Sequence, residues 1–313
     1  MQAIQSAITF MQNLGAACMM PNVPHRQKSY KGETLLMGKL LLISDLDKTL
    51  LDNNAKVPQP CLDSIAAFTA QGSLFSVCTG RPTRGALMYS ELVSLINTPI
   101  ISYNGACIYD TKASHALWQV FLPSETEDVF CTALELFPRI GLAIYRGEDD
   151  LTCTIHPNEY TDELLWKRES YRAETCTLRD FPKPWNKCVL TGPEEDMAKC
   201  AKFIRENTPC PITSVLSEKI FLEVNGPDVS KGKALVRLSE YLQLPIENII
   251  AIGDSMNDKP MLQAAGVSVA VANAIPEVQT MVNVVVAANY EFGICECIER
   301  VALPLLRGES ISK

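Results

Sequence analysis

The sequence contains no long hydrophobic run. No stretch of the chain approaches the ~18 uninterrupted apolar residues of a membrane-spanning helix, so we expect no membrane span. Internal repeats and low-complexity segments are also absent. Residues 1–36 lack the basic start and the longer apolar run of a secretory signal. We interpret them as an N-terminal extension that is disordered or partly helical.

Positive charge is scarce in the middle of the chain. Residues 122–225 carry 12 Lys and Arg against 19 Asp and Glu, a net charge of −7 out of −8 for the whole chain. This acidic segment contains no Lys or Arg cluster. The pattern argues against nucleic acid and against anionic membrane surfaces as partners.

The 12 cysteines show no spacing that indicates a metal site. They are scattered through apolar contexts, and only Cys295 and Cys297 lie close together. Two neighbouring thiols with few partners are weak evidence for a metal. The arrangement predicts buried, reduced thiols in a cytoplasmic protein.

The chain has enough apolar sequence for a substantial core. Of its 313 residues, 47% are hydrophobic and 20% charged. The length suits one large or two moderate domains, and the composition argues against a globally disordered chain. Strands and helices alternate in two separate parts of it. The first part has expected strands at 40–45, 73–78 and 99–103 and helices at 59–71 and 84–95. The last part has an expected helix at 231–242 and strands at 249–252, 267–271 and 282–287.

Such alternation predicts a parallel sheet with helices on both faces. Between the two parts the pattern changes to mixed helices, expected at 124–137, 159–170 and 193–207, with short strand-like runs. We therefore predict an α/β protein with a Rossmann-like, doubly wound parallel sheet. Residues 37–121 and 225–313 form this core, and residues 122–224 form an inserted α+β domain.

Two acidic residues follow the first expected strand directly. Asp45 and Asp47 come after a strongly apolar run and lie two positions apart. Ligands of open α/β sheets bind at the carboxyl ends of the strands, and two carboxylates there repel each other unless a cation lies between them. The pattern indicates a Mg²⁺ site with one Asp as nucleophile. The alternative is a strand that simply leaves the core into a polar turn.

Four further polar residues follow strands or begin helices: Thr79, Lys231, Asp254 and Asp258. In a parallel sheet these groups converge on one edge, although Thr79 and Lys231 are 152 residues apart. Phosphoryl transfer needs such a set, namely a nucleophile, an acid–base group, a cation, a hydroxyl donor and a fixed positive charge. Taken singly, each residue has a local alternative. Lys231, for example, could be a solvated first-turn residue after a helix N-cap.

The ordered motifs resemble those of the haloacid dehalogenase superfamily. They are Asp45-Leu46-Asp47-Lys48-Thr49, Cys78-Thr79-Gly80-Arg81-Pro82, Ser230-Lys231-Gly232 and Gly253-Asp254-Ser255-Met256-Asn257-Asp258. Three other segments of the chain resemble the Cof-type branch of this superfamily in particular. These are Ser102-Tyr103-Asn104-Gly105-Ala106, Phe221-Leu222-Glu223-Val224 and Val271-Ala272-Asn273-Ala274. The resemblance implies this superfamily's fold, with a C2-type cap at residues 122–224.

The resemblance also implies roles for the motif residues. Asp45 would be the nucleophile that forms an aspartyl-phosphate, and Asp47 the general acid and then the general base. Thr79 would donate its hydroxyl to a phosphate oxygen. Lys231 would hold Asp45 and the phosphate by its charge.

The metal and substrate contacts follow from the same resemblance. Mg²⁺ would be bound by Asp45, the backbone carbonyl of Asp47, Asp254 and Asp258. Candidate substrate contacts are Gly80, Arg81, Asn104 and Asn257. Asn104 is first of all a turn residue before Gly105, and Arg81 could equally form a local salt bridge. Lys48 replaces the family's usual glycine, which leaves the geometry of this loop open.

We therefore expect a cytoplasmic, Mg²⁺-dependent phosphatase of small phosphorylated metabolites, with sugar phosphates as the best substrates. One alternative is a sugar phosphomutase, which uses a similar site but returns the phosphoryl group to the sugar. The other is a catalytically silent binding or regulatory protein, which would be free to lose residues such as Asp45 and Lys231. Neither the physiological substrate nor the oligomeric state follows from the sequence.

Overall fold

The structure is a computed structural model, and it describes residues 39–147, 151–168 and 173–311. The predicted N-terminal extension, residues 1–36, lies outside the described residues. All described residues belong to one unit of the chain, Thr34–Lys313. Within this part, every helix is too short or too polar to cross a membrane.

A five-stranded parallel sheet forms the core, with the strand order β14-β13-β12-β1-β2. Its strands are β1 (Leu41–Ser44), β2 (Leu74–Val77), β12 (Ile249–Gly253), β13 (Val267–Val271) and β14 (Val284–Val286). Strand β1 lies between β2 and β12, so the first and last parts of the chain build one sheet. All four side chains of β1 are buried, as its apolar sequence predicts for a strand covered on both faces. The predicted α/β fold class is confirmed.

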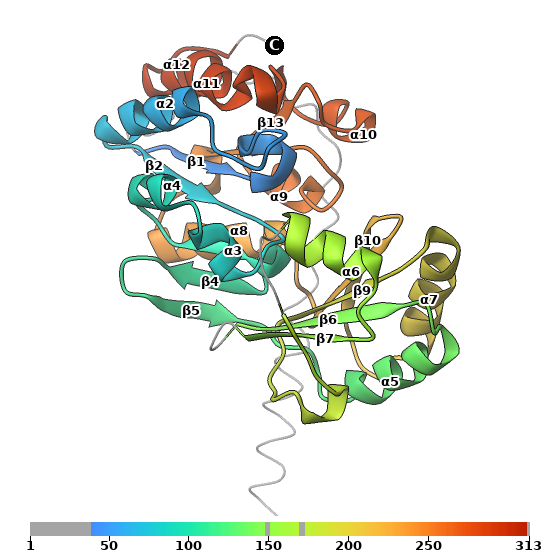
Figure 1. The fold of residues 1–313 in the computed structure, drawn as a ribbon. Helices are drawn as coiled ribbons and strands as arrows, with labels where there is room; N and C mark the ends of the chain where they lie inside the picture. Colours follow the sequence, from blue (N-terminus) through green and yellow to red (C-terminus); the bar gives the residue numbers. More distant parts are fainter. Residues whose placement is uncertain (1–38, 148–150, 169–172, 312–313) are drawn as a thin grey trace, which may run out of the picture. The chain divides into compact units, whose positions relative to one another are not determined.

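Helices cover this sheet on both faces, with α2, α11 and α12 on one side and α8 on the other (Figure 1). The helices of this region are α2 (Gln59–Ala70), α3 (Thr83–Leu87), α4 (Ser90–Leu95), α8 (Lys231–Leu242), α9 (Lys259–Ala264), α10 (Pro276–Gln279), α11 (Gly293–Cys297) and α12 (Leu303–Leu306). The prediction of a single helix at 84–95 is wrong. Two short helices, α3 and α4, form instead, because the backbone of Tyr89 leaves the helical region with φ −90° and ψ 75°.

A small antiparallel sheet that the sequence did not predict follows the second parallel strand. It consists of β3 (Ile100–Ser102), β4 (Cys107–Asp110) and β5 (His115–Gln119). A single parallel bridge between Cys78 and Ile101 connects β3 to the end of β2. The expected strand at 99–103 therefore exists, but it pairs mainly with its own hairpin partner, β4.

A separate six-stranded sheet has the order β10-β11-β9-β6-β7-β8. Its strands are β6 (Gly141–Arg146), β7 (Leu151–Ile155), β8 (Glu174–Thr175), β9 (Lys187–Thr191), β10 (Thr213–Glu218) and β11 (Phe221–Asn225). Helices α5 (Thr126–Leu136) and α7 (Glu194–Asn207) pack against one face. The short helix α6 (Glu159–Asp162) leads into a segment whose Leu164 and Leu165 pack on the other face beside Tyr145.

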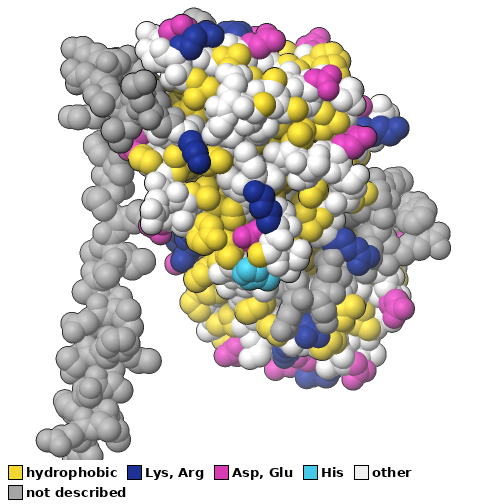
Figure 2. Space-filling model, turned by 90° about the vertical axis from the view of Figure 1, so that its left-hand side faces the viewer, with side chains coloured by type: hydrophobic (Ala, Val, Ile, Leu, Met, Phe, Trp, Pro, Cys, Tyr) yellow, Lys and Arg dark blue, Asp and Glu magenta, His cyan; other side chains and the backbone are white. Residues whose placement is uncertain are grey.

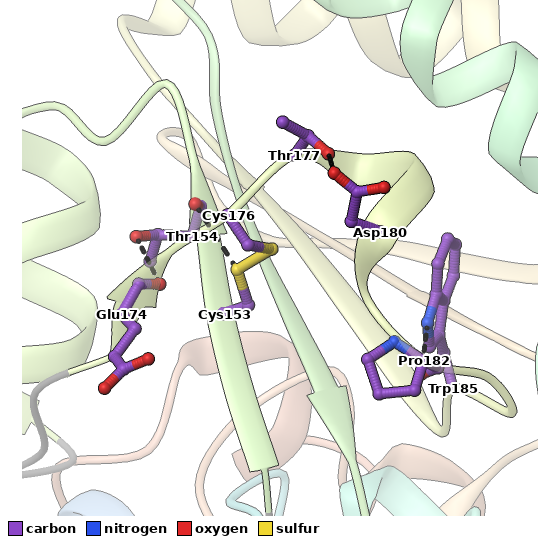
Figure 3. Close-up of a disulfide and its surroundings, with 8 residues drawn as sticks. All are labelled: Cys153, Thr154, Glu174, Cys176, Thr177, Asp180, Pro182 and Trp185. Carbon is purple, nitrogen blue, oxygen red and sulfur yellow. Dashed lines mark hydrogen bonds between the residues drawn. A yellow bond between two sulfur atoms is a disulfide. The ribbon is translucent and has the colours of Figure 1, made fainter.

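A disulfide joins Cys153 on β7 to Cys176, the residue after β8 (Figure 3). The prediction that the cysteines are reduced is therefore wrong for this pair. Because the two residues are 23 positions apart, their spacing gave no signal in the sequence. The parallel pairing of β7 with β8 brings Cys153 opposite Glu174 and so places both cysteines next to each other. The other described cysteines are free thiols.

Figure 2 shows how charged side chains are distributed on one face of the molecule. On the face shown in Figure 2, Lys and Arg side chains lie in separate small groups among hydrophobic and uncharged side chains. This face therefore offers no continuous basic patch for a polyanion among the described residues.

Candidate active site

The ends of β1 and β12 place two carboxylates on the same edge of the core sheet. Asp45 follows β1, and its backbone N–H donates to the carbonyl of Ile252 in β12 at 3.0 Å. Asp254 directly follows β12. Both residues are buried although they are acidic, with 5% and 7% of their surface exposed. The predicted convergence at the carboxyl edge therefore holds for this pair.

Lys231 lies at the start of α8 and reaches two of the acidic side chains. Its ammonium nitrogen lies 2.6 Å from Asp45 Oδ1 and 2.6 Å from Asp258 Oδ1. The lysine side chain is fully buried. Ser230 caps the helix by accepting from the Lys233 N–H at 3.2 Å. The first turn is thus held by its cap, and Lys231 points into the site instead of into solvent.

A close backbone approach fixes the position of α8. Gly105 has φ +102°, and a Cβ there would lie 2.4 Å from the carbonyl oxygen of Ser230. Only glycine permits both this backbone conformation and this contact. The turn after β3 consequently packs directly against the residue that precedes Lys231.

The loop after β12 folds around Asp258. Its Oδ2 accepts from the backbone N–H groups of Asp254 at 3.0 Å and Ser255 at 3.1 Å. Because Oδ1 is bound to Lys231, both oxygens of this fully buried carboxylate have partners. Asp258 therefore holds the loop and orients Lys231 at the same time.

Three carboxylates and one ammonium meet in this buried space. Oxygen atoms of Asp45, Asp254 and Asp258 all lie within 4.8 Å of one another. Burial raises the pKa of Asp45 well above its ordinary value, and the neighbouring carboxylates raise it further. The positive charge of Lys231 lowers this pKa but does not outweigh them. Burial and Asp258 likewise raise the pKa of Asp254 to about 7. One lysine does not balance three carboxylates, and this excess of hard oxygen donors fits a divalent cation such as Mg²⁺.

Asp47 lies on the loop after β1 and is bound by Arg81. The Nε and Nη2 atoms of Arg81 donate to its two oxygens at 2.8 and 2.7 Å. Thr79 lies one residue after Cys78 at the end of β2, and its Oγ1 accepts from the Arg81 N–H at 3.1 Å. The Arg81 side chain is buried, whereas the Asp47 side chain is 49% exposed. The local salt bridge, one of the two sequence-based interpretations of Arg81, is what the structure shows.

Asn104 and Asn257 lie between the core and the six-stranded sheet. Asn104 has a positive φ of 59°, as its turn signal indicated, and its amide donates to Glu223 of β11. Its Oδ1 accepts from the Asn257 amide at 3.4 Å. A Cβ on Gly80 would lie 2.8 Å from the same Oδ1, so Asn104 packs closely on the backbone after Thr79.

Two residues at this boundary, Lys187 and Glu223, were not assigned a role from the sequence. Lys187 of β9 is buried, donates to the Gly80 carbonyl at 2.9 Å and pairs with Glu223 at 2.7 Å. Burial would raise the pKa of Glu223, but the Lys187 charge and several hydrogen bonds outweigh it and lower this pKa. A lysine immediately before the apolar run of a strand was the available signal, and it is a weak one.

Lys48 shows why its position favours glycine. Its φ is +59°, a left-handed conformation that side chains disfavour. The Asn273 amide donates to the Lys48 carbonyl at 2.7 Å, and the Lys48 ammonium lies 3.5 Å from Glu218 of β10. The loop therefore keeps the conformation that suits glycine while its side chain extends toward the six-stranded sheet.

Known proteins share both the sequence pattern and the fold. Residues 42–298 match the family of haloacid dehalogenase-like hydrolases. A 5-amino-6-(5-phospho-D-ribitylamino)uracil phosphatase of Bacillus subtilis is 28% identical over 280 residues, which cover 82% of this chain and 96% of the relative. The HMP-PP phosphatase of Yersinia enterocolitica is 27% identical over 242 residues, which cover 75% and 84%.

Solved structures agree. A haloacid dehalogenase-like hydrolase from Bacteroides thetaiotaomicron has a TM-score of 0.74 and 26% identity, over 84% of this chain and 100% of its own. The predicted superfamily with its Cof-type branch, and the predicted enzyme class of phosphoric monoester hydrolases, are confirmed by these comparisons. The chain belongs to the haloacid dehalogenase-like hydrolase family.

Proposed function

We propose that this hydrolase is a Mg²⁺-dependent phosphatase of small phosphorylated metabolites, and that it works through an aspartyl-phosphate on Asp45. The observation that supports this most strongly is the buried Lys231, which joins Asp45 and Asp258 at the carboxyl edge of the sheet. A lysine with two carboxylate partners keeps its charge, and the charges of Asp258 and Asp45 raise its pKa although burial opposes them.

In the first half-reaction, a carboxylate oxygen of Asp45 attacks phosphorus. The bond from phosphorus to the ester oxygen breaks, and its electron pair stays on that oxygen, which takes a proton from Asp47. Thr79 and Lys231 would stabilise the phosphoryl oxygens by a hydroxyl donor and a fixed charge. The products are an alcohol and the aspartyl-phosphate.

In the second half-reaction, water attacks the same phosphorus atom. Asp47, now a carboxylate, takes a proton from this water, and the bond between phosphorus and Asp45 breaks. Phosphate leaves and the starting carboxylate of Asp45 is restored. One residue thus serves as acid and then as base, which requires that its carboxylate faces the departing alcohol and the incoming water in turn.

Asp45, Asp254, Asp258 and the backbone carbonyl of Asp47 would hold the metal. When bound, Mg²⁺ supplies positive charge beside the nucleophile and the phosphoryl oxygens. Without a cation, the three acidic side chains face a single lysine. The requirement for Mg²⁺ is therefore part of the proposal.

Residues 122–224 would act as the cap that sets substrate specificity, and residues 37–121 and 225–313 would form the catalytic core. Lys187 and Glu223 support this division, because they connect the six-stranded sheet with Gly80 and Asn104 of the core. Gly80, Asn104 and Asn257 stay the candidates for substrate contacts, whereas the guanidinium of Arg81 is bound to Asp47. A lid of this kind excludes water and adds contacts to the alcohol part of the substrate.

Sugar phosphates are our first choice of substrate class, and a cytoplasmic location stays a prediction. The two relatives described above are phosphatases of a phosphoribitylamino-uracil and of HMP-PP. Small phosphorylated metabolites are what these names share, and this supports the coarser proposal. It does not choose between a sugar and a heterocycle.

The test is phosphate release from p-nitrophenyl phosphate and a panel of sugar phosphates, with Mg²⁺ or with EDTA. Asp45→Asn removes the nucleophile, and Asp63→Asn, an exposed residue of α2, is the matched control. We expect release that requires both Mg²⁺ and Asp45 and that is unchanged in the control. Release only with a phosphorylated activator would point to a mutase. No release from any ester by the folded, Mg²⁺-loaded protein would contradict the proposal.

A further inference from the structure

The two side chains of the Arg81–Asp47 ion pair differ strongly in their exposure to solvent. The arginine side chain is 4% exposed, whereas the aspartate side chain is 49% exposed. Two parallel N–H groups of the guanidinium donate to the two carboxylate oxygens. Such a fork fixes the plane of the carboxylate as well as its distance. The arginine therefore holds Asp47 from the protein side and leaves its other side open.

Arg81 is itself fixed by its surroundings. Its backbone N–H donates to Thr79 Oγ1 at 3.1 Å, and its carbonyl accepts from the Tyr103 N–H at 2.9 Å. Nη1 lies 3.7 Å from Met88 Sδ, and the guanidinium carbon lies 5.6 Å from the centre of the Tyr89 ring. The helix break at Met88 and Tyr89 places these side chains against the guanidinium. Arg81 thus links Asp47 to the segment that follows β2.

Asp47 needs such support because its own loop is irregular. The backbone is non-helical at Asp47, with ψ 125°, and left-handed at Lys48. A carboxylate on such a loop can rotate unless another group orients it. An ionised carboxylate has about four acceptor positions, of which the fork occupies two. A position that remains can carry the proton that the ester oxygen takes, and in the carboxylate form it can accept a proton from water.

We propose that Arg81 is a positioning residue for the proton transfers of Asp47. This inference rests on the proposed phosphatase function and assigns Arg81 no contact with the reacting atoms. The fork holds the carboxyl group so that it meets the ester oxygen as the phosphorus–oxygen bond breaks. Esters that need this proton should therefore depend on Arg81, and esters with a good leaving group should not.

The experiment compares two substrates that share the phosphoryl group and differ in the alcohol. p-Nitrophenolate leaves without assistance, whereas the alkoxide of glucose 6-phosphate needs a proton. The ratio kcat/KM is measured for each, because it reports the half-reaction in which the leaving group departs. The variants are Arg81→Lys, which keeps the charge but not the fork, Arg81→Gln, Asp47→Asn, and the control Arg84→Gln, an exposed arginine three residues later.

We expect both Arg81 variants to lower kcat/KM for glucose 6-phosphate about 30-fold or more while the value for p-nitrophenyl phosphate changes about threefold or less. Asp47→Asn should show the same selectivity, and Arg84→Gln should show none. The first burst of p-nitrophenolate, which needs only the half-reaction in which the leaving group departs, also demonstrates that each variant is folded.

An equal loss on both substrates would overturn the inference, because it would indicate a direct phosphate contact or a general structural role. An unchanged ratio in Arg81→Gln would overturn it as well. If the wild-type protein with Mg²⁺ hydrolyses neither ester, the proposed function fails together with this inference. A wild-type protein that hydrolyses both, with variants that show no selectivity, refutes the positioning role alone.

Discussion

Replacing Lys231 by methionine should destabilise the metal-free protein strongly. Methionine has a similar length and no charge, so the main loss is the ammonium that lies 2.6 Å from both Asp45 and Asp258. Removing one partner of a buried ion pair costs about 3–5 kcal/mol, because the remaining charge has no water and no partner. Here two carboxylates lose their partner at once. We therefore expect a cost at or above the upper part of that range.

The same helix supplies a matched control. Lys233, two positions later, pairs with Asp228 at 2.8 Å, but the two side chains are 47% and 77% exposed. Exposed pairs of this kind contribute about 0–1 kcal/mol. Lys233→Met therefore changes the same residue type, in the same helix, with a similar pair distance. The two variants differ mainly in the burial of the pair.

The assay is urea unfolding of both variants and the wild type in EDTA at pH 7. We expect Lys231→Met to lose at least about 3 kcal/mol more than Lys233→Met, which is a midpoint difference of about 1 M or more if m is near 3 kcal/mol/M. Mg²⁺ should reduce this difference, because a bound cation would offset the carboxylate charge. Equal costs for the two variants would refute the claim that the buried Lys231 ammonium offsets the charges of Asp45 and Asp258.

Other changes should have distinct effects. Gly105→Ala forces a side chain onto the start of α8, so we expect stability and phosphatase activity to fall together. Thermal unfolding and turnover measure the two losses, and unchanged activity would contradict this expectation. Burial opposes the ionisation of Glu223, but Lys187 lowers its pKa overall, so its stabilising contribution is complete above the ordinary carboxyl range and lost as the pH falls through the lowered pKa. The difference in unfolding free energy between wild type and Glu223→Gln should therefore be larger at pH 7 than at pH 3. A larger difference at pH 3 would contradict the lowered pKa of Glu223. Changing Cys153 and Cys176 to alanine should cost about 3 kcal/mol for a loop of this length, and thiol labelling without reductant should modify neither cysteine in the wild type.

The core of the fold was predictable because its signals are local. The apolar run before Asp45 is short, continuous and ended by polar residues, which is typical of a strand that lies inside a parallel sheet. Parallel strands then bring their carboxyl ends together by geometry alone. The convergence of Asp45, Asp254 and Lys231 therefore followed once the strands were placed.

Contacts between distant side chains were not predictable in the same way. The guanidinium that binds Asp47 lies against Met88 and Tyr89 at the helix break, and no proline or glycine marks this break in the sequence. The disulfide of Cys153 depends on which strand lies next to β7. Likewise, the role of Lys187 depends on the position of β9, which places the Lys187 ammonium on the Gly80 carbonyl. Each of these contacts depends on tertiary placement, for which the local sequence carries at most a weak signal.

The measurement that tests the central claim most directly is chemical trapping of the intermediate. The wild-type protein with Mg²⁺ is mixed with p-nitrophenyl phosphate, quenched during turnover and treated with borohydride, which reduces an aspartyl-phosphate to homoserine. Peptide mass spectrometry should then find homoserine at position 45 and nowhere else, and the signal should be absent in Asp45→Asn. Full phosphate release with an unmodified Asp45 in every trapped sample would contradict the account.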